Sequence, residues 1–408
     1  MNGMAMAVDR VWIGLTVGLL LVGASACQPS RSPADERAYR ASNGSGDLLI
    51  GAGWPWTAKP ELLYREGMDM AVDEINRNGG VNGRPLRIVR EDDRESVDDG
   101  RLVAQRFTSN PDIVAVIGHL HSYVTNPAAA IYDAAGVTMI APASTDPELT
   151  RHGYSHLFRT IFTDSDVGQQ LAAFAAGRGY RRLAIFYVRT SYGRALANAF
   201  EDTATQLGAR ILDRQSYDPN ESFGAPVVDR MLEEWKARNL SAILFAGEAA
   251  PAARFIARAR EIGLTTPVLA GDAAGTPELF SQGTEPVEGT IIASAFHPKD
   301  RRPEVVRFVD AFERRYDKLP DAAAALAYDA VRLLARAITE AQSAAPERVA
   351  DALHHAAEWP GVTGAFRFDD RGDPLDRPIV LMVAHDGTFD FLAGSPPVGG
   401  QGDSHHDP

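Results

Sequence analysis

Residues 113–150, IVAVIGHLHSYVTNPAAAIYDAAGVTMIAPASTDPELT, contain one complete strand–helix–strand unit. The apolar run IVAVIG (113–118) has the length of a buried strand, and residues 126–135 show the apolar spacing of an amphipathic helix. A second apolar run, VTMIA (137–141), follows at once. Two strands joined through a helix pair in parallel, because such a crossover returns the chain to the same end of the sheet. The segment therefore predicts an α/β fold.

The same alternation continues on both sides of this unit. Before it, apolar runs at 48–52 and 84–89 alternate with helical patterns at 61–78 and 98–108. After it comes a second series, with runs at 183–188, 210–217, 242–247, 267–271 and 289–294 and helical patterns at 165–177, 194–207, 225–238 and 252–261. Helices at 304–316, 322–342 and after Pro346, and a strand pair near 366–368 and 379–383, close the chain. Two such series predict two lobes, each a doubly wound parallel sheet.

Composition agrees with a globular protein of two domains. The chain has 408 residues, of which 45% are hydrophobic and 23% charged. There are 54 acidic residues against 41 Lys and Arg, so the formal net charge is −13. Nucleic acid is excluded as a partner, because binding a phosphate backbone requires a basic surface. A single cysteine also excludes an intrachain disulfide.

The first 26 residues have the pattern of a secretory signal peptide. Val11–Ala26 holds 16 consecutive uncharged residues after Arg10, fewer than the about 20 that a transmembrane helix needs. Small residues at 24–26 followed by Cys27 resemble the lipobox of bacterial lipoproteins, in which Cys27 would carry the lipid. The same Ala-Ser-Ala also fits the pattern of the ordinary signal peptidase, and both alternatives place the cut before Cys27. We expect an exported protein, anchored to a membrane through Cys27.

Two segments beside the folded body have no helical or strand period. Residues 27–46 are polar and contain Pro, Gly and Ser, which predicts a flexible tether between lipid and body. Residues 394–408 predict a disordered tail.

Two hydroxyl clusters follow neighbouring strands of the first series. Ser122 and Thr125 come after IVAVIG, and Ser144 and Thr145 come after VTMIA. In open α/β sheets ligands gather at the carboxyl ends of strands, where helix N-termini offer backbone N–H groups to anions. Either cluster alone is equally explained as ordinary helix capping. Together they indicate a carboxylate or other anion site.

Motifs for other chemistry are missing or incomplete. The sequence has no G-x-S-x-G, no G-x-x-x-x-G-K-[ST] and no H-E-x-x-H, and Gly51-Ala52-Gly53 lacks the third glycine of a dinucleotide fingerprint. His119 and His121 lie two apart at a strand end, but a metal would need a further ligand nearby, so packing or surface roles are favoured. We expect no metal, no cofactor and no enzymatic activity.

Several longer segments resemble the periplasmic leucine/isoleucine/valine-binding proteins of ABC importers, a branch of the type I periplasmic binding proteins. They are GGVNGRPLRIVREDD (79–93), residues 116–150, LFRTIFTDSDVGQQLAAF (157–174), Ser191-Tyr192-Gly193, residues 258–264 and residues 366–372. The resemblance implies two α/β lobes joined by three crossovers, placed near Thr163, His297 and Thr363, which close around one solute as a hinged trap. The implied N-terminal lobe is 47–162 plus 298–362, and the C-terminal lobe is 163–297 plus 363–393.

The resemblance also implies a set of ligand-binding residues. Ser122 matches the serine that holds the solute carboxylate, and Ala143 and Thr145, with Ser144 between them, match the second hydroxyl loop. Tyr192 matches the tyrosine at the mouth of the second lobe. Asp272 stands where the family has a glutamate facing the solute ammonium, and the alternative is an ordinary solvated turn aspartate.

The chain departs from the family at three points in the expected cleft. Trp54 and Trp56 replace a small first-lobe loop, either as cleft walls or as core residues. Glu248 replaces a second tyrosine and either faces the solute or points to solvent. Aromatic rings together with Glu248 and Asp272 would favour a solute with more positive charge or a flat apolar part.

These observations lead to one functional expectation. We expect a monomeric, lipid-anchored, extracytoplasmic protein that captures a small amino-acid-like solute and delivers it to an ABC permease. The alternative is a sensory protein of the same fold, which would report the solute to a receptor.

Overall fold

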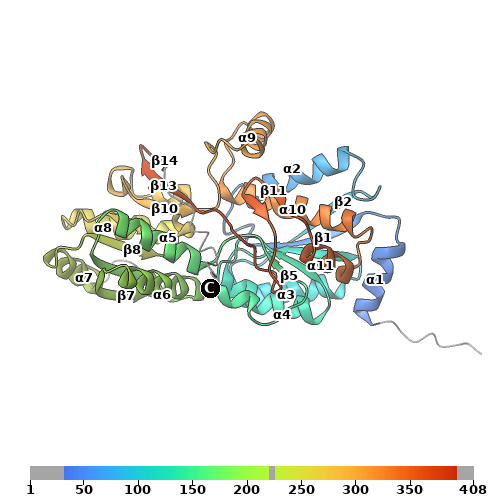
Figure 1. The fold of residues 1–408 in the computed structure, drawn as a ribbon, viewed down its shortest axis with the longest axis horizontal. Coiled ribbons are helices and arrows are strands. Elements are labelled where there is room, and N and C mark those ends of the chain that lie inside the picture. Colours follow the sequence, from blue (N-terminus) through green and yellow to red (C-terminus); the bar gives the residue numbers. More distant parts are fainter. Residues whose placement is uncertain (1–31, 220–225, 393–408) are drawn as a thin grey trace, which may run out of the picture.

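The computed structural model describes residues 32–219 and 226–392, which form two sheets with helices on both faces (Figure 1). The first sheet has the strand order β2-β1-β3-β4-β5 and the second β14-β13-β10-β9-β8-β6-β7. All pairs of the first sheet are parallel. In the second, all pairs among β6 to β10 are parallel, whereas β13 pairs antiparallel with both β10 and β14. Two doubly wound lobes were predicted from the alternation of runs and helices, and the sheets confirm them.

The first lobe is a five-stranded sheet between two apolar layers. Helices α2 and α10 pack on one face around Tyr64, Phe308 and Leu334, and α3 and α4 pack on the other around Phe107 and Tyr132. A short hairpin, β11–β12, adds to the first of these faces. The elements are β1 (Leu48–Trp54), α2 (Tyr64–Arg77), β2 (Leu86–Asp92), α3 (Val97–Ser109), β3 (Ile113–Gly118), α4 (Ser122–Ala134), β4 (Thr138–Ala141), η1 (Pro147–Thr150), β5 (Leu157–Arg159), α9 (Pro303–Tyr316), α10 (Ala322–Glu340), α11 (Pro346–His354), β11 (Trp359–Gly361) and β12 (Gly364–Phe366).

The second lobe repeats this design on a seven-stranded sheet. Helices α5 and α6 cover one face around Leu171 and Phe200, and α7 and α8 cover the other around Trp235 and Phe255. The elements are α5 (Asp164–Gly177), β6 (Arg182–Val188), α6 (Ser191–Gln206), β7 (Arg210–Tyr217), α7 (Pro226–Ala237), β8 (Ala242–Ala246), α8 (Ala249–Glu261), β9 (Val268–Ala270), η2 (Asp272–Ala274), η3 (Pro277–Phe280), η4 (Glu285–Val287), β10 (Ile291–Ser294), β13 (Val380–His385) and β14 (Thr388–Phe391).

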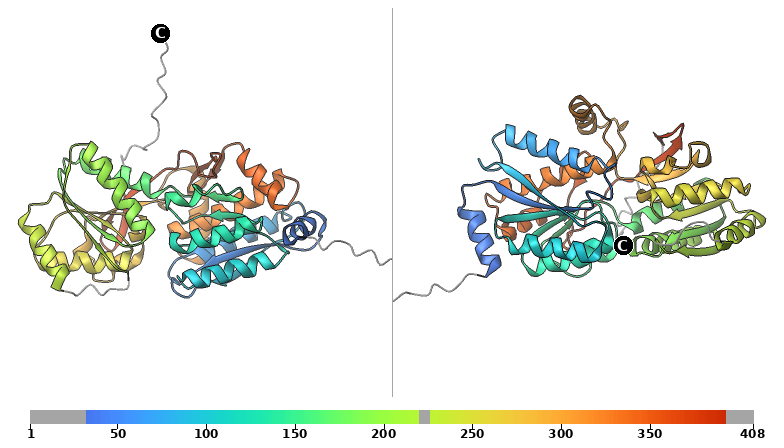
Figure 2. Two further views of the ribbon diagram at one scale, coloured as in Figure 1. Left: turned by 90° about the horizontal axis from the view of Figure 1, so that it is seen from below. Right: turned by 180° about the vertical axis from the view of Figure 1, so that it is seen from behind.

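The chain passes between the two sheets three times, after β5, after β10 and before β13 (Figure 2). The third passage lies later than the predicted boundary at residue 363. Phe366 and Phe368 belong to the first-lobe core, and Asp373 forms an ion pair with Arg159 of β5. The predicted pairing of 366–368 with 379–383 is also wrong, because β12 pairs with β11 while β13 pairs with β10 and β14.

Part of the predicted tether is a helix, α1 (Pro33–Asn43), capped by the side chain of Ser32. Arg37 is fully buried, and its guanidinium donates to the carbonyls of Thr108, Ile113 and Ala135. Two of these carbonyls lie at the ends of α3 and α4, where helices have no internal donors. The polar composition of this segment did not indicate a helix, because α1 is held on the lobe by the hydrogen bonds of Arg37 and not by an apolar face.

The leader, Cys27 and the tail 394–408 lie outside the described residues. Within residues 32–219 and 226–392, no helix combines the length and apolar character needed to cross a bilayer.

Candidate functional site

The predicted site residues gather where the carboxyl ends of strands from both sheets face each other. Ser122 and Thr145 follow β3 and β4 of the first lobe, and Tyr192 and Asp272 follow β6 and β9 of the second. A groove of about 1290 Å³ runs along helices α5 and α6 of the second lobe and reaches the segment 146–151 of the first lobe. Its lining includes Asp146 and Ser191, the sequence neighbours of Thr145 and Tyr192, but none of the predicted site residues themselves.

The first-lobe wall is made of Ser122 and the loop 143–146. Helix α4 begins at Ser122 itself, four residues earlier than predicted, and its N-cap His121 makes no side-chain cap bond. The Ser122 hydroxyl accepts a hydrogen bond of 3.3 Å from the Asp146 amide, and Asp146 in turn accepts from Asn126 at 2.9 Å. These bonds place a helix N-terminus beside a hydroxyl loop, an arrangement that suits an anion.

Ser144 serves this wall from within the lobe. Its side chain is fully buried, contacts the Thr125 hydroxyl and lies 3.4 Å from the His119 carbonyl oxygen. Because its hydroxyl is occupied there, Ser144 supports the loop from inside the lobe, while Ser122 and Thr145 are themselves buried and Ala143 is half-buried.

Arg159 ties the loop to the third passage between the lobes. Its buried guanidinium donates to the Asp146 carbonyl at 2.6 Å, to the Thr150 hydroxyl at 2.9 Å and to Asp373 at 2.8 Å. The Thr150 hydroxyl also donates to Asp373 at 2.7 Å. The Arg159 guanidinium also lies 3.4 Å from the Ser144 carbonyl, so it connects the residues on both sides of Thr145 to the third passage between the lobes.

The second-lobe wall has fewer bonds. The Tyr192 hydroxyl donates to Asp272 at 3.3 Å and accepts from the Ala273 amide at 3.4 Å. A Cβ on Gly271 would lie 2.3 Å from this hydroxyl, so glycine is what lets the ring fold against Asp272. Burial raises the pKa of Asp272 to about 6, although the hydrogen bonds to it act in the opposite direction. This carboxylate is charged at neutral pH but poorly compensated, which favours the predicted role over that of a solvated turn aspartate.

Asp164 is a site residue that the sequence analysis missed. It begins α5 directly after the first passage between the lobes, and its amide donates to the Thr145 carbonyl at 2.8 Å. Both carboxylate oxygens are buried and make no hydrogen bond of ordinary geometry, although the Thr145 side chain lies close enough to oppose part of the rise in the pKa of Asp164. Burial raises its pKa well above the ordinary value, and the nearby charge of Asp272 adds to the rise. Two undercompensated carboxylates therefore stand near the hydroxyl loop.

The two tryptophans of the first loop take different places. Trp54 is 1% exposed and stacks on Tyr64 at a centroid distance of 3.6 Å, which makes it a core residue. Trp56 is half-buried, donates to the Glu91 carbonyl at 3.0 Å and lies under the guanidinium groups of Arg65 and Arg90. Of the two predicted alternatives, the core role therefore holds for Trp54, and Trp56 is engaged within its own lobe.

Glu248 faces the other lobe. It is the N-cap residue of α8, and its carboxylate lies 3.1 Å from Lys59 Nζ. This pairing differs from both predicted alternatives, a charge offered to the solute and a charge pointing to solvent. An intramolecular lysine already balances it.

The histidines follow the packing alternative. The ring nitrogens of His119 contact Asp93 at 2.6 Å and Tyr132 at 3.3 Å inside the first lobe. A Cβ on Gly53 would lie 2.5 Å from the His119 ring, so this strand end must be glycine. In the described part of the chain, the side chains close enough to share a metal ion are those of Glu288, His385 and Asp386, which are exposed.

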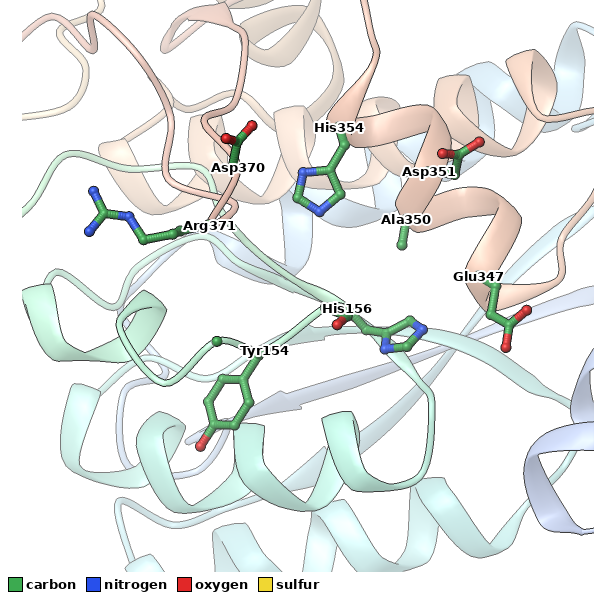
Figure 3. Close-up of a pocket in the computed structure, with 10 residues that line it drawn as sticks. Tyr154, His156, Glu347, Ala350, Asp351, His354, Asp370 and Arg371 are labelled. Carbon is green, nitrogen blue, oxygen red and sulfur yellow. The ribbon is translucent and has the colours of Figure 1, made fainter.

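A second depression, of about 500 Å³, lies on the first lobe away from the cleft (Figure 3). His354 and Glu347 come to it from α11, and His156 comes from the segment before β5. It contains none of the predicted site residues.

Sequence signals for the missed residues existed but were weak. Arg159 is a lone cation inside the apolar LFRTIF, and Asp164 lies next to Thr163, which forms a capping box with Asp166. The capping box accounts for Thr163 and Asp166 as helix-capping residues, but it gives no structural role to Asp164 between them.

Comparisons with known proteins agree with this geometry. Residues 56–388 match the family model described as periplasmic binding protein. The Leu/Ile/Val-binding protein of Escherichia coli is 30% identical over 310 residues, which cover 75% of this chain and 82% of that protein. The Leu/Ile/Val-binding protein homolog 1 of Brucella suis is 29% identical over 355 residues, and this alignment covers 85% of this chain and 93% of that protein.

A solved structure gives the same result. The ABC transporter substrate-binding protein of Desulfitobacterium hafniense in complex with Leu is 39% identical, has a TM-score of 0.77, and covers 85% of this chain and 100% of its own. Because the family model spans most of the sequence and the lobes have the predicted topology, the chain belongs to the periplasmic binding protein family and has its type I fold.

Proposed function

We propose that this protein is the extracytoplasmic solute receptor of an ABC importer and that its solute is a zwitterionic amino acid of the branched-chain class. The observation that carries the proposal is the pair of carboxylates near the hydroxyl loop, Asp164 without a hydrogen bond of ordinary geometry and Asp272 with a raised pKa. Buried carboxylates in such a state favour a cation that enters with the solute. The relatives named for leucine, isoleucine and valine support the same class.

The two walls would take opposite ends of the solute. Ser122, Ala143 and Thr145, beside the N-terminus of α4, would bind the carboxylate. Asp272 and Asp164 would bind the ammonium group, and the Tyr192 ring would cover it. Closure of the lobes would then bury both charges together, and no bond of the solute would be made or broken.

The anchor and the partner belong to the same proposal. A lipid on Cys27 would hold the protein, as a monomer, at the outer face of a membrane, where an ABC permease receives the solute. The leader pattern and the cysteine that follows it support this placement.

Calorimetric titration with L-leucine, leucinamide and 4-methylpentanoate tests the assignment of the two ends. Leucinamide lacks the carboxylate, and 4-methylpentanoate lacks the ammonium group. We expect L-leucine to bind at least about 100-fold more tightly than either analogue, because each leaves one wall without its counter-charge. Equal binding of all three, or no binding of any α-amino acid, would contradict the proposed site.

Two variants locate the binding. Thr145→Ala and Asp272→Asn should each weaken L-leucine binding by more than about tenfold. Asp351→Asn, an exposed position on α11, is the matched control and should leave the affinity unchanged.

A further inference from the structure

Lys59 joins the two lobes at the cleft, in a part of the chain that differs from the family pattern. It lies in the loop between β1 and α2. Its Nζ is 3.1 Å from Glu248 and 3.7 Å from Glu278, which both belong to the second lobe. The same Nζ is 3.7 Å from Glu95 of its own lobe.

The loop that carries Lys59 is fixed to the first lobe. The Thr57 hydroxyl donates to Asp92 at 2.6 Å, and the Lys59 amide donates to the Pro55 carbonyl at 3.0 Å. Trp56 anchors the same loop through the Glu91 carbonyl. The ammonium group is thus presented from a fixed base, which reduces the entropy lost when it meets its partners.

The ion cluster is also shielded. The Lys59 side chain is 15% exposed and those of Glu95, Glu248 and Glu278 are 31%, 39% and 34% exposed. His121 extends the cluster, because its ring lies 3.0 Å from Glu95 and 3.9 Å from Glu248. Burial lowers the pKa of Lys59, but the carboxylates, Glu248 first, outweigh burial and raise it overall. A shielded cation among three carboxylates interacts more strongly than an exposed surface pair.

We propose that Lys59 is a positioning residue for solute binding, acting as an electrostatic latch between the lobes. In the closed protein it contacts Glu248 and Glu278; when the hinge opens, it keeps only Glu95. The latch therefore stabilises the closed state whether or not solute is present. A larger closed fraction raises the apparent affinity for any solute that binds that state.

Small-angle X-ray scattering of the solute-free protein tests the latch without knowledge of the solute. Lys59→Met should increase the radius of gyration relative to the unsubstituted chain, because the closed fraction falls. The double variant Glu248→Gln with Glu278→Gln should do the same by removing the second-lobe partners, and it decides the question if Lys59→Met folds poorly. Lys236→Met, whose ammonium donates to the Ile262 carbonyl within its own lobe, is the matched control and should leave the radius unchanged.

Affinity gives the second readout. Where L-leucine binds, Lys59→Met should weaken it on the order of tenfold, and Glu95→Gln, which keeps both cross-lobe contacts, should weaken it less. An unchanged radius in both Lys59→Met and the double glutamine variant would overturn the latch. Failure of L-leucine to bind the unsubstituted chain would instead count against the proposed solute and leave the scattering test intact.

Discussion

The two walls of the cleft differ in how their polar groups are held. On the first-lobe wall, Ser122, Ser144 and Asp146 each have a partner inside the lobe, and Arg159 fixes the loop from below. On the second-lobe wall, the Asp272 side chain accepts one long bond from Tyr192 together with backbone hydrogen bonds, and burial still raises its pKa. The polar groups of the first-lobe wall are therefore held in place without solute. The second-lobe wall presents a carboxylate, Asp272, that lacks a counter-charge.

This difference predicts an order of events. A completed wall can bind the solute carboxylate in an open protein, because no further ordering is needed there. The second wall gains most from closure, because only closure brings the ammonium group to Asp272 and Asp164. The comparison therefore separates residues whose loss harms folding from residues whose loss harms binding alone.

The largest effect is expected on the first-lobe wall. Arg159→Met should lower the free energy of unfolding by about 3–5 kcal/mol, since it leaves Asp373, the Asp146 carbonyl and the Thr150 hydroxyl without their buried donor. Urea unfolding measures this loss. Arg106→Met, which breaks the exposed pair with Glu91, should change stability by less than about 1 kcal/mol. Similar values for the two variants would remove the basis for calling this wall prebuilt.

The opposite pattern is expected for Asp272→Asn. We expect it to weaken L-leucine binding by about 30- to 100-fold, because the ammonium group loses its counter-charge. The solute-free variant should be more stable at pH 7, by about 1–2 kcal/mol after allowing for solvent in the cleft, because a carboxylate with a raised pKa is destabilising when ionised. Thermal unfolding with and without L-leucine separates the two effects. A variant that binds poorly because it is less stable would contradict this account.

A pH series sharpens the same point. The pKa of Asp272 is raised to about 6 from its ordinary value of 3.8, so the folded protein binds this proton more tightly than the unfolded chain. Its ionisation therefore lowers solute-free stability as pH rises through this window, and stability from this group recovers as pH falls below about 6. As pH falls through about 6, the Asp272 carboxylate is neutralised, and the affinity for L-leucine should fall with it. If Asp272→Asn titrates like the unsubstituted protein, another group is responsible.

The smallest effect is expected for Tyr192→Phe. The hydroxyl makes two long bonds, of 3.3 and 3.4 Å, so its removal should change stability by less than about 0.5 kcal/mol and L-leucine affinity by about three- to tenfold. Parallel calorimetry and thermal unfolding measure both. A stability loss as large as that of Arg159→Met would mean that the second wall is also a structural element.

Much of the fold was predictable because its signals are local. Alternating apolar runs and helical patterns predicted both sheets, and strand β7 was predicted with its observed ends at 210 and 217. The carboxyl ends of strands indicated Ser122 and Thr145, and the family resemblance added Tyr192 and Asp272.

The remaining features depend on contacts between distant residues. Helix α1 is fastened by Arg37 to carbonyls more than 70 positions away, and Lys59 meets Glu248 across 189 positions. Trp54 looked like a cleft residue at its strand end, but its stacking on Tyr64 places it in the core. Such pairings leave no period in a single sequence.

Hydrogen exchange of the protein with and without L-leucine tests the difference between the walls most directly. The account predicts that segments 119–126 and 138–150 are already protected in the solute-free protein and gain little when L-leucine is added. Segments 188–196 and 269–276 should gain the larger protection. Equal gains on both walls, or a gain confined to the first-lobe segments, would contradict the claim that one wall is prebuilt and the other is completed by the solute.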